Sequence, residues 1–432
     1  MRLRAAALAL ACAGALSGPD VEVDGATNDS RSLRPGQLFV PLVAERDGHG
    51  FVTAALATGA AAYLTARPPV GGTAIVVDDT GAALLACGRL ARSTLPERVV
   101  GVTGSVGKTS VKDLLAAALA TMWATAASER SFNNEIGVPL TLLGAPDGTE
   151  AVVLEMGARG VGHIRLLCEV GRPTVGVVTS VAAVHTELFG SIDEVALGKG
   201  ELVEALPSSG TAVLNADDER VAAMAARTAA RVLLFGGRGE VRAEAVACDD
   251  GLRPSFRLCT PWGDAQVRLE VRGAHQVGNA LAAAAAALAC GVALPAVAEG
   301  LGAAVPSPLR MDLQRSRSGA LVLNDAYNAN PTSMAAALQA LAALPGTGRR
   351  VAILGPMTEL VEPAAAHAEV AALAVSLGIE LIPTGTKLYG PEPADDPVAT
   401  IGPLDPDDAV LVKASRAARL EHLAEALLAG ST

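Results

Sequence analysis

The chain has 432 residues, which at roughly 100 to 200 residues per domain predicts two to four domains. Half of the residues are apolar and 18% are charged, so the composition excludes an intrinsically disordered chain. There are 34 lysine and arginine residues against 45 aspartate and glutamate residues, a net charge of −11 that argues against a general nucleic-acid or anionic-membrane surface. We therefore expect neither nucleic-acid binding nor membrane insertion, and any phosphate site must be built locally.

Two apolar segments could be mistaken for membrane signals. Residues 5–18 follow two arginines and are similar to a signal peptide, but 14 residues are too few to span a bilayer. Residues 280–298 carry no charge, yet alanine dominates them and Gly291 and Pro295 interrupt them, which favours a buried helix followed by a turn. The six cysteines are scattered without a C-x-x-C pair, which is typical of reduced thiols in the cytoplasm. We expect a cytoplasmic monomer.

From about residue 35 onward, short β-branched runs alternate with alanine-rich helical stretches. This alternation predicts βαβ units, parallel sheets and hence an α/β fold. The last third, from LVLND at 321–325 to AVLVKAS at 409–415, has the pattern of a doubly wound open sheet. Breaks near STLPER and AAVPSPLR divide the chain into predicted domains at residues 1–90, 91–306 and 307–432.

Residues 101–110, GVTGSVGKTS, lie between an apolar strand and a helix-forming stretch and predict a phosphate-binding P-loop. The strict pattern requires glycine where this chain has Val102, and the glycines at 101, 104 and 107 supply the flexibility instead. A purely structural turn would not need a lysine after its third glycine. In a P-loop, backbone N–H groups hold phosphate, the lysine reaches the outer phosphates and the next hydroxyl reaches Mg²⁺. The predicted nucleotide contacts are Gly104, Ser105, Gly107, Lys108, Thr109 and Ser110.

Two further side chains follow predicted strands. Glu155 ends the apolar run AVVL, and His185 follows the next apolar strand. The carboxyl ends of parallel strands open onto the crevice where α/β folds bind ligands, so both side chains can meet the Mg²⁺ that Thr109 would hold. Without that placement, Glu155 would be an ordinary loop glutamate and His185 a structural histidine. We predict Thr109, Glu155 and His185 as metal ligands.

These motifs resemble the Mur ligase superfamily, the ATP-dependent ligases that build the peptide of the peptidoglycan precursor. Similar segments run through the whole chain, including NDSRSLRPGQLFVPL at 28–42, EMGARGVGHI at 155–164, GAHQVGNALAA at 273–283 and VLVKASR at 410–416. Within the superfamily, SFNNEIGVPLTLL and NDAYNANPTSM resemble the branch that adds D-alanyl-D-alanine to UDP-N-acetylmuramoyl-tripeptide. The resemblance implies three domains, with a central P-loop domain and a C-terminal Rossmann-like domain.

The resemblance also implies catalytic roles for residues outside the P-loop. Lys199, in LGKGEL, reads as an exposed lysine by itself, but the family segment implies a carbamylated side chain that supplies oxygen ligands to a second Mg²⁺. His275 and Asn279 are implied nucleotide contacts. Arg310 matches the position that reaches the γ-phosphate, and we expect it to complete the phosphate site when the C-terminal domain closes on the central domain.

The remaining implied residues contact the substrates. Asp325, Tyr327 and Asn328 follow a predicted strand and would contact ribose, adenine or the incoming dipeptide, in roles that the sequence does not apportion. Ser30 and Arg31 belong to a D-S-R segment that resembles a uridine-diphosphate holding element, with Asp47 and His49 nearby. Arginine suits pyrophosphate because it stays charged and binds bidentately. Asn133 and Asn134 complete the predicted substrate contacts.

Several residues depart from the family pattern, and three other functions stay open. The departures are Asn324, Pro356, Val361 and Ala414, and none lies in the P-loop or the metal set. The alternatives are a folylpolyglutamate or cyanophycin synthetase-like ligase and a catalytically silent nucleotide-binding paralogue. The D-S-R and D-G-H segments argue against a folate enzyme, and retention of Lys108, Glu155, His185 and Lys199 argues against a silent paralogue. The third residue of the acceptor peptide, lysine or diaminopimelate, is not encoded in a recognisable motif.

Overall fold

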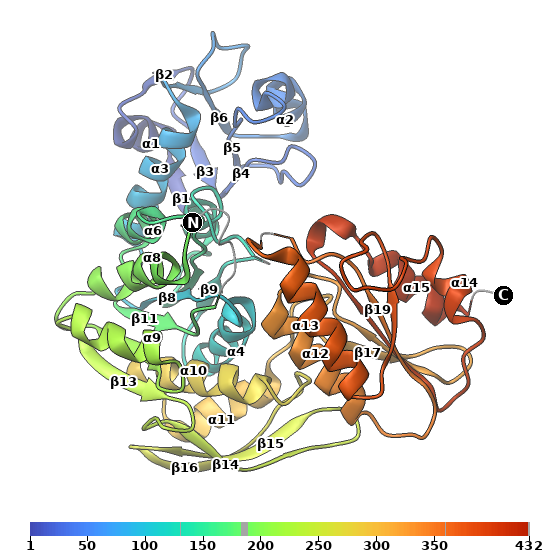
Figure 1. Cartoon of the computed structure of the whole chain (residues 1–432). Coiled ribbons are helices and arrows are strands. Elements are labelled where there is room, and N and C mark those ends of the chain that lie inside the picture. Colours follow the sequence, from blue (N-terminus) through green and yellow to red (C-terminus); the bar gives the residue numbers. More distant parts are fainter. Residues whose placement is uncertain (130, 183–188, 359, 431–432) are drawn as a thin grey trace.

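The computed structural model of the chain describes residues 1–129, 131–182, 189–358 and 360–430. Its helices and strands group into an N-terminal region from β1 to α3, a central region from β8 to α11 and a C-terminal region from β17 to α15 (Figure 1). The predicted α/β fold is confirmed. His185 lies outside the described residues.

The central region is built on a parallel sheet with the strand order β13-β12-β11-β8-β10-β9. Its strands are near-continuous runs of buried valine and leucine, as expected for a parallel sheet that helices cover on both faces. The elements of this part are β8 (Val99–Thr103), α4 (Lys108–Ala120), β9 (Thr125–Ala127), α5 (Gly137–Gly144), β10 (Ala151–Glu155), α6 (His163–Gly171), β11 (Val175–Val178), α8 (Ile192–Glu204), β12 (Thr211–Asn215), α9 (Glu219–Ala223), η2 (Met224–Arg227) and β13 (Arg231–Phe235).

Alternate strand residues face two different cores. Val100 and Val102 pack with α4, α10 (Gln276–Ala289) and α11 (Leu294–Ala303), whereas Val99 packs on the side of α6 and α8. Small residues let the helices approach closely, because a Cβ on Gly300 of α11 would lie 2.5 Å from Ala118 Cα of α4. The apolar segment 280–298 is therefore a buried helix, a turn and the start of α11. No described helix is long and apolar enough to cross a membrane.

The C-terminal region carries a second sheet, with the order β17-β18-β21-β19-β20. β17 pairs antiparallel at one edge and the other strands pair in parallel, so the predicted doubly wound pattern acquires an antiparallel edge strand. The elements are β17 (Asp312–Arg315), β18 (Leu321–Asn324), α12 (Pro331–Ala343), β19 (Arg350–Leu354), α13 (Pro363–Ser376), β20 (Glu380–Pro383), α14 (Pro397–Ile401), β21 (Ala409–Lys413), η3 (Arg416–Ala418) and α15 (Glu421–Ala429).

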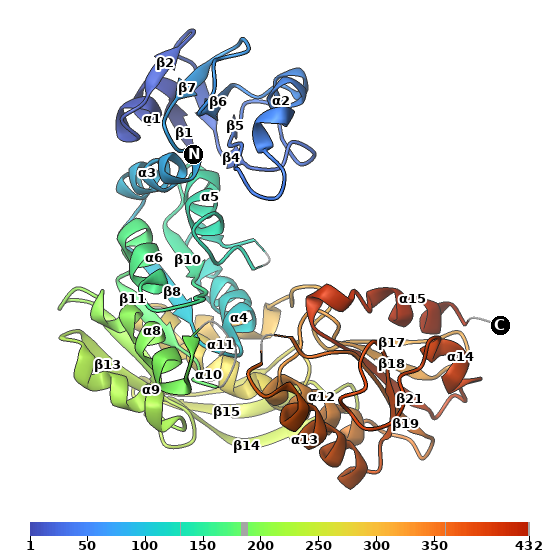
Figure 2. The same ribbon diagram turned by 45° about the horizontal axis from the view of Figure 1, so that its top comes forward.

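The N-terminal region shares an apolar core with the central region. Its sheet has the order β2-β7-β6-β5-β4, and Figures 1 and 2 both place α3 between this sheet and the central region. Leu8 of the signal-like segment and Leu84 of α3 are fully buried in the same cluster as Leu154 and Ile164 of the central region. The elements are β1 (Arg2–Arg4), α1 (Ala5–Ala11), β2 (Ala15–Ser17), β3 (Glu22–Asp24), β4 (Ala26–Thr27), β5 (Leu38–Phe39), η1 (Gly48–Phe51), α2 (Val52–Thr58), β6 (Ala62–Thr65), β7 (Ala74–Val76) and α3 (Thr80–Thr94).

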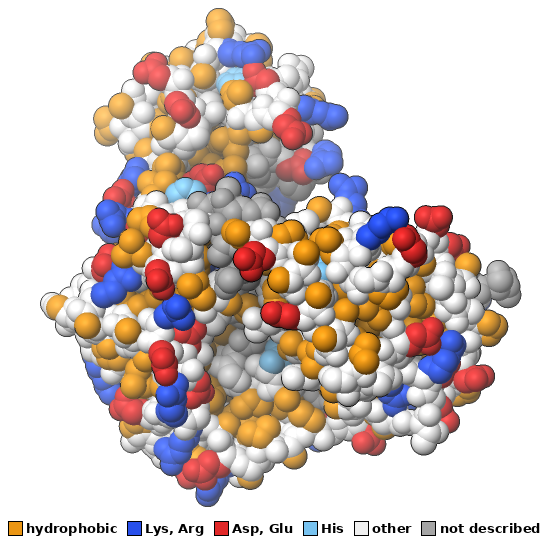
Figure 3. Space-filling view, viewed as in Figure 1, with side chains coloured by type: hydrophobic (Ala, Val, Ile, Leu, Met, Phe, Trp, Pro, Cys, Tyr) orange, Lys and Arg blue, Asp and Glu red, His pale blue; other side chains and the backbone are white. Residues whose placement is uncertain are grey.

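Two features were not anticipated from the sequence. The predicted division at residue 90 falls inside α3, because Asp79 caps this helix and it continues to Thr94. An antiparallel sheet of β14 (Arg242–Cys248), β15 (Pro254–Thr260) and β16 (Gly263–Arg268) follows β13. On the face shown in Figure 3, positive and negative side chains are interspersed over all three regions.

We predict that Leu84→Ala lowers the free energy of unfolding by about 2–5 kcal/mol, because it removes a fully buried side chain from the shared core. Leu10→Ala is the matched control, since Leu10 is 84% exposed and should change stability by less than about 0.5 kcal/mol. Denaturant unfolding measures both. Equal losses for the two variants would contradict a shared core at α3.

Candidate active site

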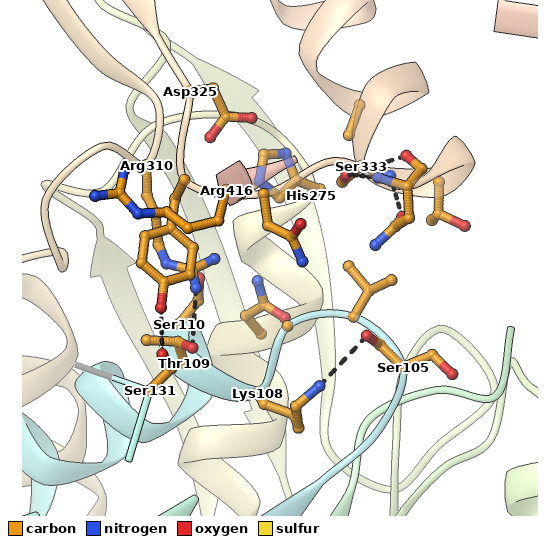
Figure 4. A pocket seen from close by; sticks show the side chains of 18 of the residues that line it. Ser105, Lys108, Thr109, Ser110, Ser131, His275, Arg310, Asp325, Ser333 and Arg416 are labelled. Carbon is orange, nitrogen blue, oxygen red and sulfur yellow. Dashed lines mark hydrogen bonds between the residues drawn. The ribbon is translucent and has the colours of Figure 1, made fainter. Parts of the chain in front are cut away.

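A cavity of about 570 Å³ lies where the carboxyl end of the central sheet faces the C-terminal region. Figure 4 shows Ser105, Lys108 and Thr109 entering it from the P-loop side, and Arg310, Asp325 and Arg416 from the opposite side. Of the predicted site residues, the cavity brings together Ser105, Gly107, Lys108, Thr109, Ser110, Asn133, Glu155, His275, Asn279, Arg310, Asp325, Tyr327 and Asn328.

The predicted P-loop is the turn between β8 and α4. Gly104 has φ +146°, and a Cβ there would lie 1.9 Å from Thr179 Oγ1. Gly107 has φ +88°, and its Cβ would lie 2.4 Å from Asn279 Oδ1. These close approaches explain why the loop needs glycine at both positions. The first turn of α4, from Lys108 to Ser110, lines the cavity, and the N-terminal turn of a helix is a favourable place for phosphate.

The loop is hydrogen-bonded to the segment after β11. Ser105 Oγ accepts from the Ala182 N–H at 2.8 Å, and the Thr179 hydroxyl donates to the Val106 carbonyl at 2.5 Å. Lys108 Nζ donates to the Gly104 carbonyl at 2.7 Å and to the Ser105 carbonyl at 3.5 Å, and Figure 4 marks the bond to Ser105. The ammonium group therefore rests over the loop, at the edge of the cavity that a phosphate would enter.

Glu155 is the buried carboxylate of the central side. It is 1% exposed, and its Oε1 accepts from Asn133 Nδ2 at 2.9 Å. Among the described residues, Oε2 is buried without a hydrogen-bond partner. A carboxylate oxygen without a partner, in a cavity that the Thr109 side chain also lines, fits a hard cation such as Mg²⁺. No group of three His, Cys, Asp or Glu side chains occurs within the described ranges, so such a cation would also need other oxygen donors.

Lys199 lies on α8 and does not line the cavity, but it is 2% exposed instead of being the surface lysine that its segment suggests. The positions on either side are closely packed, because a Cβ on Gly198 would lie 2.8 Å from the Phe189 ring and one on Gly200 would overlap Arg227. Burial, and secondly the nearby charge of Lys108, lower the pKa of Lys199 well below its usual value. The amine is therefore poised to be neutral.

The C-terminal side of the cavity centres on Arg310 and Tyr327. Arg310 Nη2 donates to Thr109 Oγ1 at 3.0 Å, and the guanidinium lies 4.3 Å from the centre of the Tyr327 ring. The Tyr327 hydroxyl is hydrogen-bonded to Ser131 of the central region. Arg310 Nε is buried without a partner within the described part of the chain, so this donor also points to a ligand.

A buried charge pair fixes the loop after β18. Lys413 Nζ binds the Asp325 carboxylate and donates to the Asn328 carbonyl at 2.9 Å. His275 lies beside this pair, and burial lowers its pKa, with a further lowering by Lys413 that Asp325 opposes. Residues 325–328 are consequently held against the start of α10.

Five predicted substrate residues lie away from the cavity. Asn134 Oδ1 accepts from the Gly137 N–H at 2.9 Å and so caps α5. Arg31 pairs bidentately with Asp29 in the exposed loop after β4, where Ser30 also lies. His49 Nδ1 lies 2.6 Å from Asp47 Oδ1, and Asp47 also pairs with Arg67. Hydrogen bonds from the His49 backbone N–H and, secondly, from its imidazole ring hold the pKa of Asp47 below its usual value.

Sequence reasoning missed part of the lining. Thr332 and Ser333 lie in the NDAYNANPTSM segment, and Lys413 and Arg416 lie in VLVKASR. Because both segments resemble the family, these four residues could have been predicted as part of the site. Arg159, which is exposed, belongs to the EMGARGVGHI segment after Glu155, but by itself it would read as a solvated arginine. The other unpredicted polar lining residues are Ser131, Gln276, Asn330 and Thr358.

A P-loop at the edge of a parallel sheet, facing a cationic cavity, defines the class of P-loop nucleotide-binding enzymes. The Mur ligase middle domain matches residues 102–287, and the Mur ligase glutamate ligase domain matches residues 309–430. The chain belongs to the Mur ligase family, which confirms the resemblance and the family's domain architecture.

Relatives match along nearly the whole chain. The UDP-N-acetylmuramoyl-tripeptide–D-alanyl-D-alanine ligase of Mycobacterium tuberculosis is 42% identical over 94% of this chain and 92% of its own length. A crystal structure of MurF from Acinetobacter baumannii superposes with a TM-score of 0.86 at 28% identity, covering 99% of both chains. The MurF ligase of Thermotoga maritima in complex with ADP gives a TM-score of 0.79 at 26% identity, over 93% of this chain and 96% of that one.

We predict that Gly104→Ala weakens binding of a non-hydrolysable ATP analogue by about tenfold or more, equal to roughly 1.4 kcal/mol. The new Cβ would overlap Thr179 Oγ1 and displace the loop. Gly148→Ala is the control, because Gly148 also has positive φ but faces open space. Calorimetric titration measures both, and unchanged affinity in Gly104→Ala would show that the loop geometry does not govern binding.

Proposed function

We propose that this chain joins D-alanyl-D-alanine to a UDP-N-acetylmuramoyl-tripeptide in peptidoglycan precursor synthesis. It is an ATP-dependent ligase. The single observation that carries the proposal is the near full-length similarity to the D-alanyl-D-alanine ligases named above, with the P-loop intact. That similarity includes the N-terminal region, so the folylpolyglutamate, cyanophycin and silent-paralogue alternatives are not favoured.

The reaction needs activation because a free carboxylate has a poor leaving group. An oxygen of the tripeptide carboxylate attacks the γ-phosphorus of ATP, forming an acyl phosphate and releasing ADP. The amine of D-alanyl-D-alanine then attacks the acyl carbon, forms the amide bond, loses a proton and expels phosphate. Lys108 and Arg310 enter the cavity from two sides, and their charges would oppose the charge on the transferring phosphoryl group.

We also propose that the central region binds two Mg²⁺ ions. Thr109 and Glu155 would hold one ion, with His185 as a further ligand, and carbamylated Lys199 would contribute to the second. Bound Mg²⁺ would neutralise phosphate charge. The lowered pKa of the buried Lys199 amine supports carbamylation, because it favours the unprotonated amine that can add to CO₂. The orphaned Glu155 oxygen supports the first ion.

We assign the nucleotide to the P-loop, His275, Asn279 and the loop at Asp325, Tyr327 and Asn328. The UDP moiety would lie in the N-terminal region, at Ser30 and Arg31. In that region, Asp47 and His49 brace the loop before α2, since His49 Nε2 accepts from the Ala66 N–H at 3.1 Å. We propose domains at residues 1–90, 91–306 and 307–432, a monomer and a cytoplasmic location. The use of ATP supports the cytoplasm.

We predict that purified protein with Mg²⁺ and ATP releases ADP only when UDP-N-acetylmuramoyl-tripeptide is present, and forms the amide only when D-alanyl-D-alanine is added. A coupled ADP assay with mass spectrometry of the product measures this. ADP formation that ignores both substrates would overturn the proposal. Lysine and diaminopimelate tripeptides, compared in parallel, would assign the third residue.

We predict that Lys199→Ala lowers kcat by about a hundredfold or more, because it removes a ligand group of the metal site. A short carboxylic acid should restore part of the activity. The exposed Lys387 is the control, and Lys387→Ala should keep wild-type activity.

Labelled ¹³C-bicarbonate should give a carbamate NMR signal in wild type that Lys199→Ala lacks. The lowered pKa predicts loss of this signal as pH falls, since protonation removes the reactive amine. A bare ammonium in the metal-loaded enzyme would contradict carbamylation.

A further inference from the structure

The segment 307–311 connects the central and C-terminal regions along the P-loop helix. Thr109 and Asp113 lie one turn apart on the same face of α4. Asp113 Oδ2 accepts from the Ser307 N–H at 3.0 Å and from the Ser307 hydroxyl at 2.7 Å. Three residues later, Arg310 reaches Thr109. One helix face therefore holds both the start of the linker and its arginine.

The other half of the linker is bound to the C-terminal region. The Tyr327 N–H donates to the Leu309 carbonyl at 3.2 Å, and the Met311 N–H donates to Asp325 Oδ1 at 3.1 Å. Residue 307 therefore moves with α4, while residues 309–311 move with the loop after β18. Any rotation of the C-terminal region must be absorbed between these attachments, around Pro308.

The backbone on both sides of Arg310 is strained. Leu309 has φ +62° and Met311 has φ +51°, the left-handed conformation that side-chain-bearing residues rarely adopt. Such conformations persist where surrounding contacts over-determine them, and they concentrate at functional sites. Here the attachments at Asp113, Asp325 and Tyr327 supply those contacts, and the strained turn directs Arg310 at Thr109.

Asp113 is itself fixed. Lys112 Nζ lies 2.9 Å from Asp113 Oδ1 and donates to the Ser128 carbonyl at 2.9 Å. Ser128 Oγ in turn accepts from the Glu155 N–H at 3.1 Å. Asp113, which holds the linker, is therefore connected by hydrogen bonds to the strand that carries Glu155, and it lies on the helix that follows the P-loop.

We propose that Asp113 is a positioning residue for phosphoryl transfer: by holding Ser307, it fixes the pivot of the C-terminal region and so brings Arg310 to the phosphate site. The catalytic part of this inference rests on the proposed function. Asp113 does not line the cavity, so it would act through the linker and not by contact with substrate.

The test compares Asp113→Ala, Ser307→Ala and the double variant in the complete chain. We expect Asp113→Ala, which removes both bonds to Ser307, to lower kcat about tenfold, and Ser307→Ala, which keeps the backbone N–H bond, to lower it about threefold, each with the KM for ATP within about twofold. The double variant should match Asp113→Ala, because that variant alone already removes both bonds. Ser307→Thr, which keeps the hydroxyl, should retain wild-type kcat. Ser318→Ala is the matched control, since it loses a hydroxyl bond to Ser316 outside the cavity.

The same variants in an Arg310→Ala background separate positioning from general destabilisation. There, Asp113→Ala should change kcat less than twofold, because the arginine that it positions is gone. An undiminished tenfold loss in that background, wild-type kcat in folded Asp113→Ala or Ser307→Ala, or a loss confined to KM would each overturn the proposal.

Hydrogen exchange gives a readout that does not need ligase activity. In Asp113→Ala, the amides of residues 307–311 should exchange about tenfold faster or more, while those of β8 stay unchanged. Unchanged exchange at residues 307–311 would overturn the proposal that Asp113 holds the linker. Wild-type protein that fails to form the amide overturns the proposed function instead, and the exchange result still tests the anchor.

Discussion

β8 pairs in parallel with β10 on one side and β11 on the other, so the loops that follow these strands leave the sheet at the same edge. The P-loop, Glu155 and the Thr179–Ala182 segment meet there for that reason. The P-loop then depends on its neighbour, because Thr179 packs where a side chain at position 104 would stand. The site is thus a consequence of strand order, and the glycines adapt the backbone to it.

The cavity is lined by more positive than negative side chains, although the protein as a whole is negatively charged. The protein carries a net charge of −11, yet the described lining holds Lys108, Arg159, Arg310, Lys413 and Arg416 against Glu155 and Asp325. Lys413 pairs with Asp325 and Arg416 pairs with Glu421, while Lys108, Arg159 and Arg310 also line the space that phosphates would fill. A local positive field in an acidic protein favours anionic ligands at this site over nonspecific binding elsewhere.

The sequence predicted the elements whose signals lie within a few consecutive residues. Valine-rich runs gave the parallel strands, and the glycine spacing before Lys108 gave the P-loop, because both signals lie within a few residues. The β14–β16 sheet escaped prediction because its strands are polar on their exposed face and bear no chemistry-bearing motif. Lys199 looks exposed in the sequence but is buried, in a stretch of α8 where Phe189 and Arg227 pack against the two adjacent glycines. Arg159 and Thr358 reach the cavity through tertiary placement, which a single sequence does not encode in any short pattern.

The apolar core that runs from Leu8 through α3 to Ile164 has a consequence for modularity. An N-terminal region joined to its neighbour by shared side chains cannot be exchanged for another without also redesigning the surfaces of α5 and α6. The C-terminal region is built differently, because its two apolar clusters draw on its own residues apart from Leu252, and the linker joins it through polar contacts. The N-terminal and central regions therefore form one rigid unit with a continuous core at α3. The C-terminal region forms a second unit, which the linker at Ser307 joins to the first.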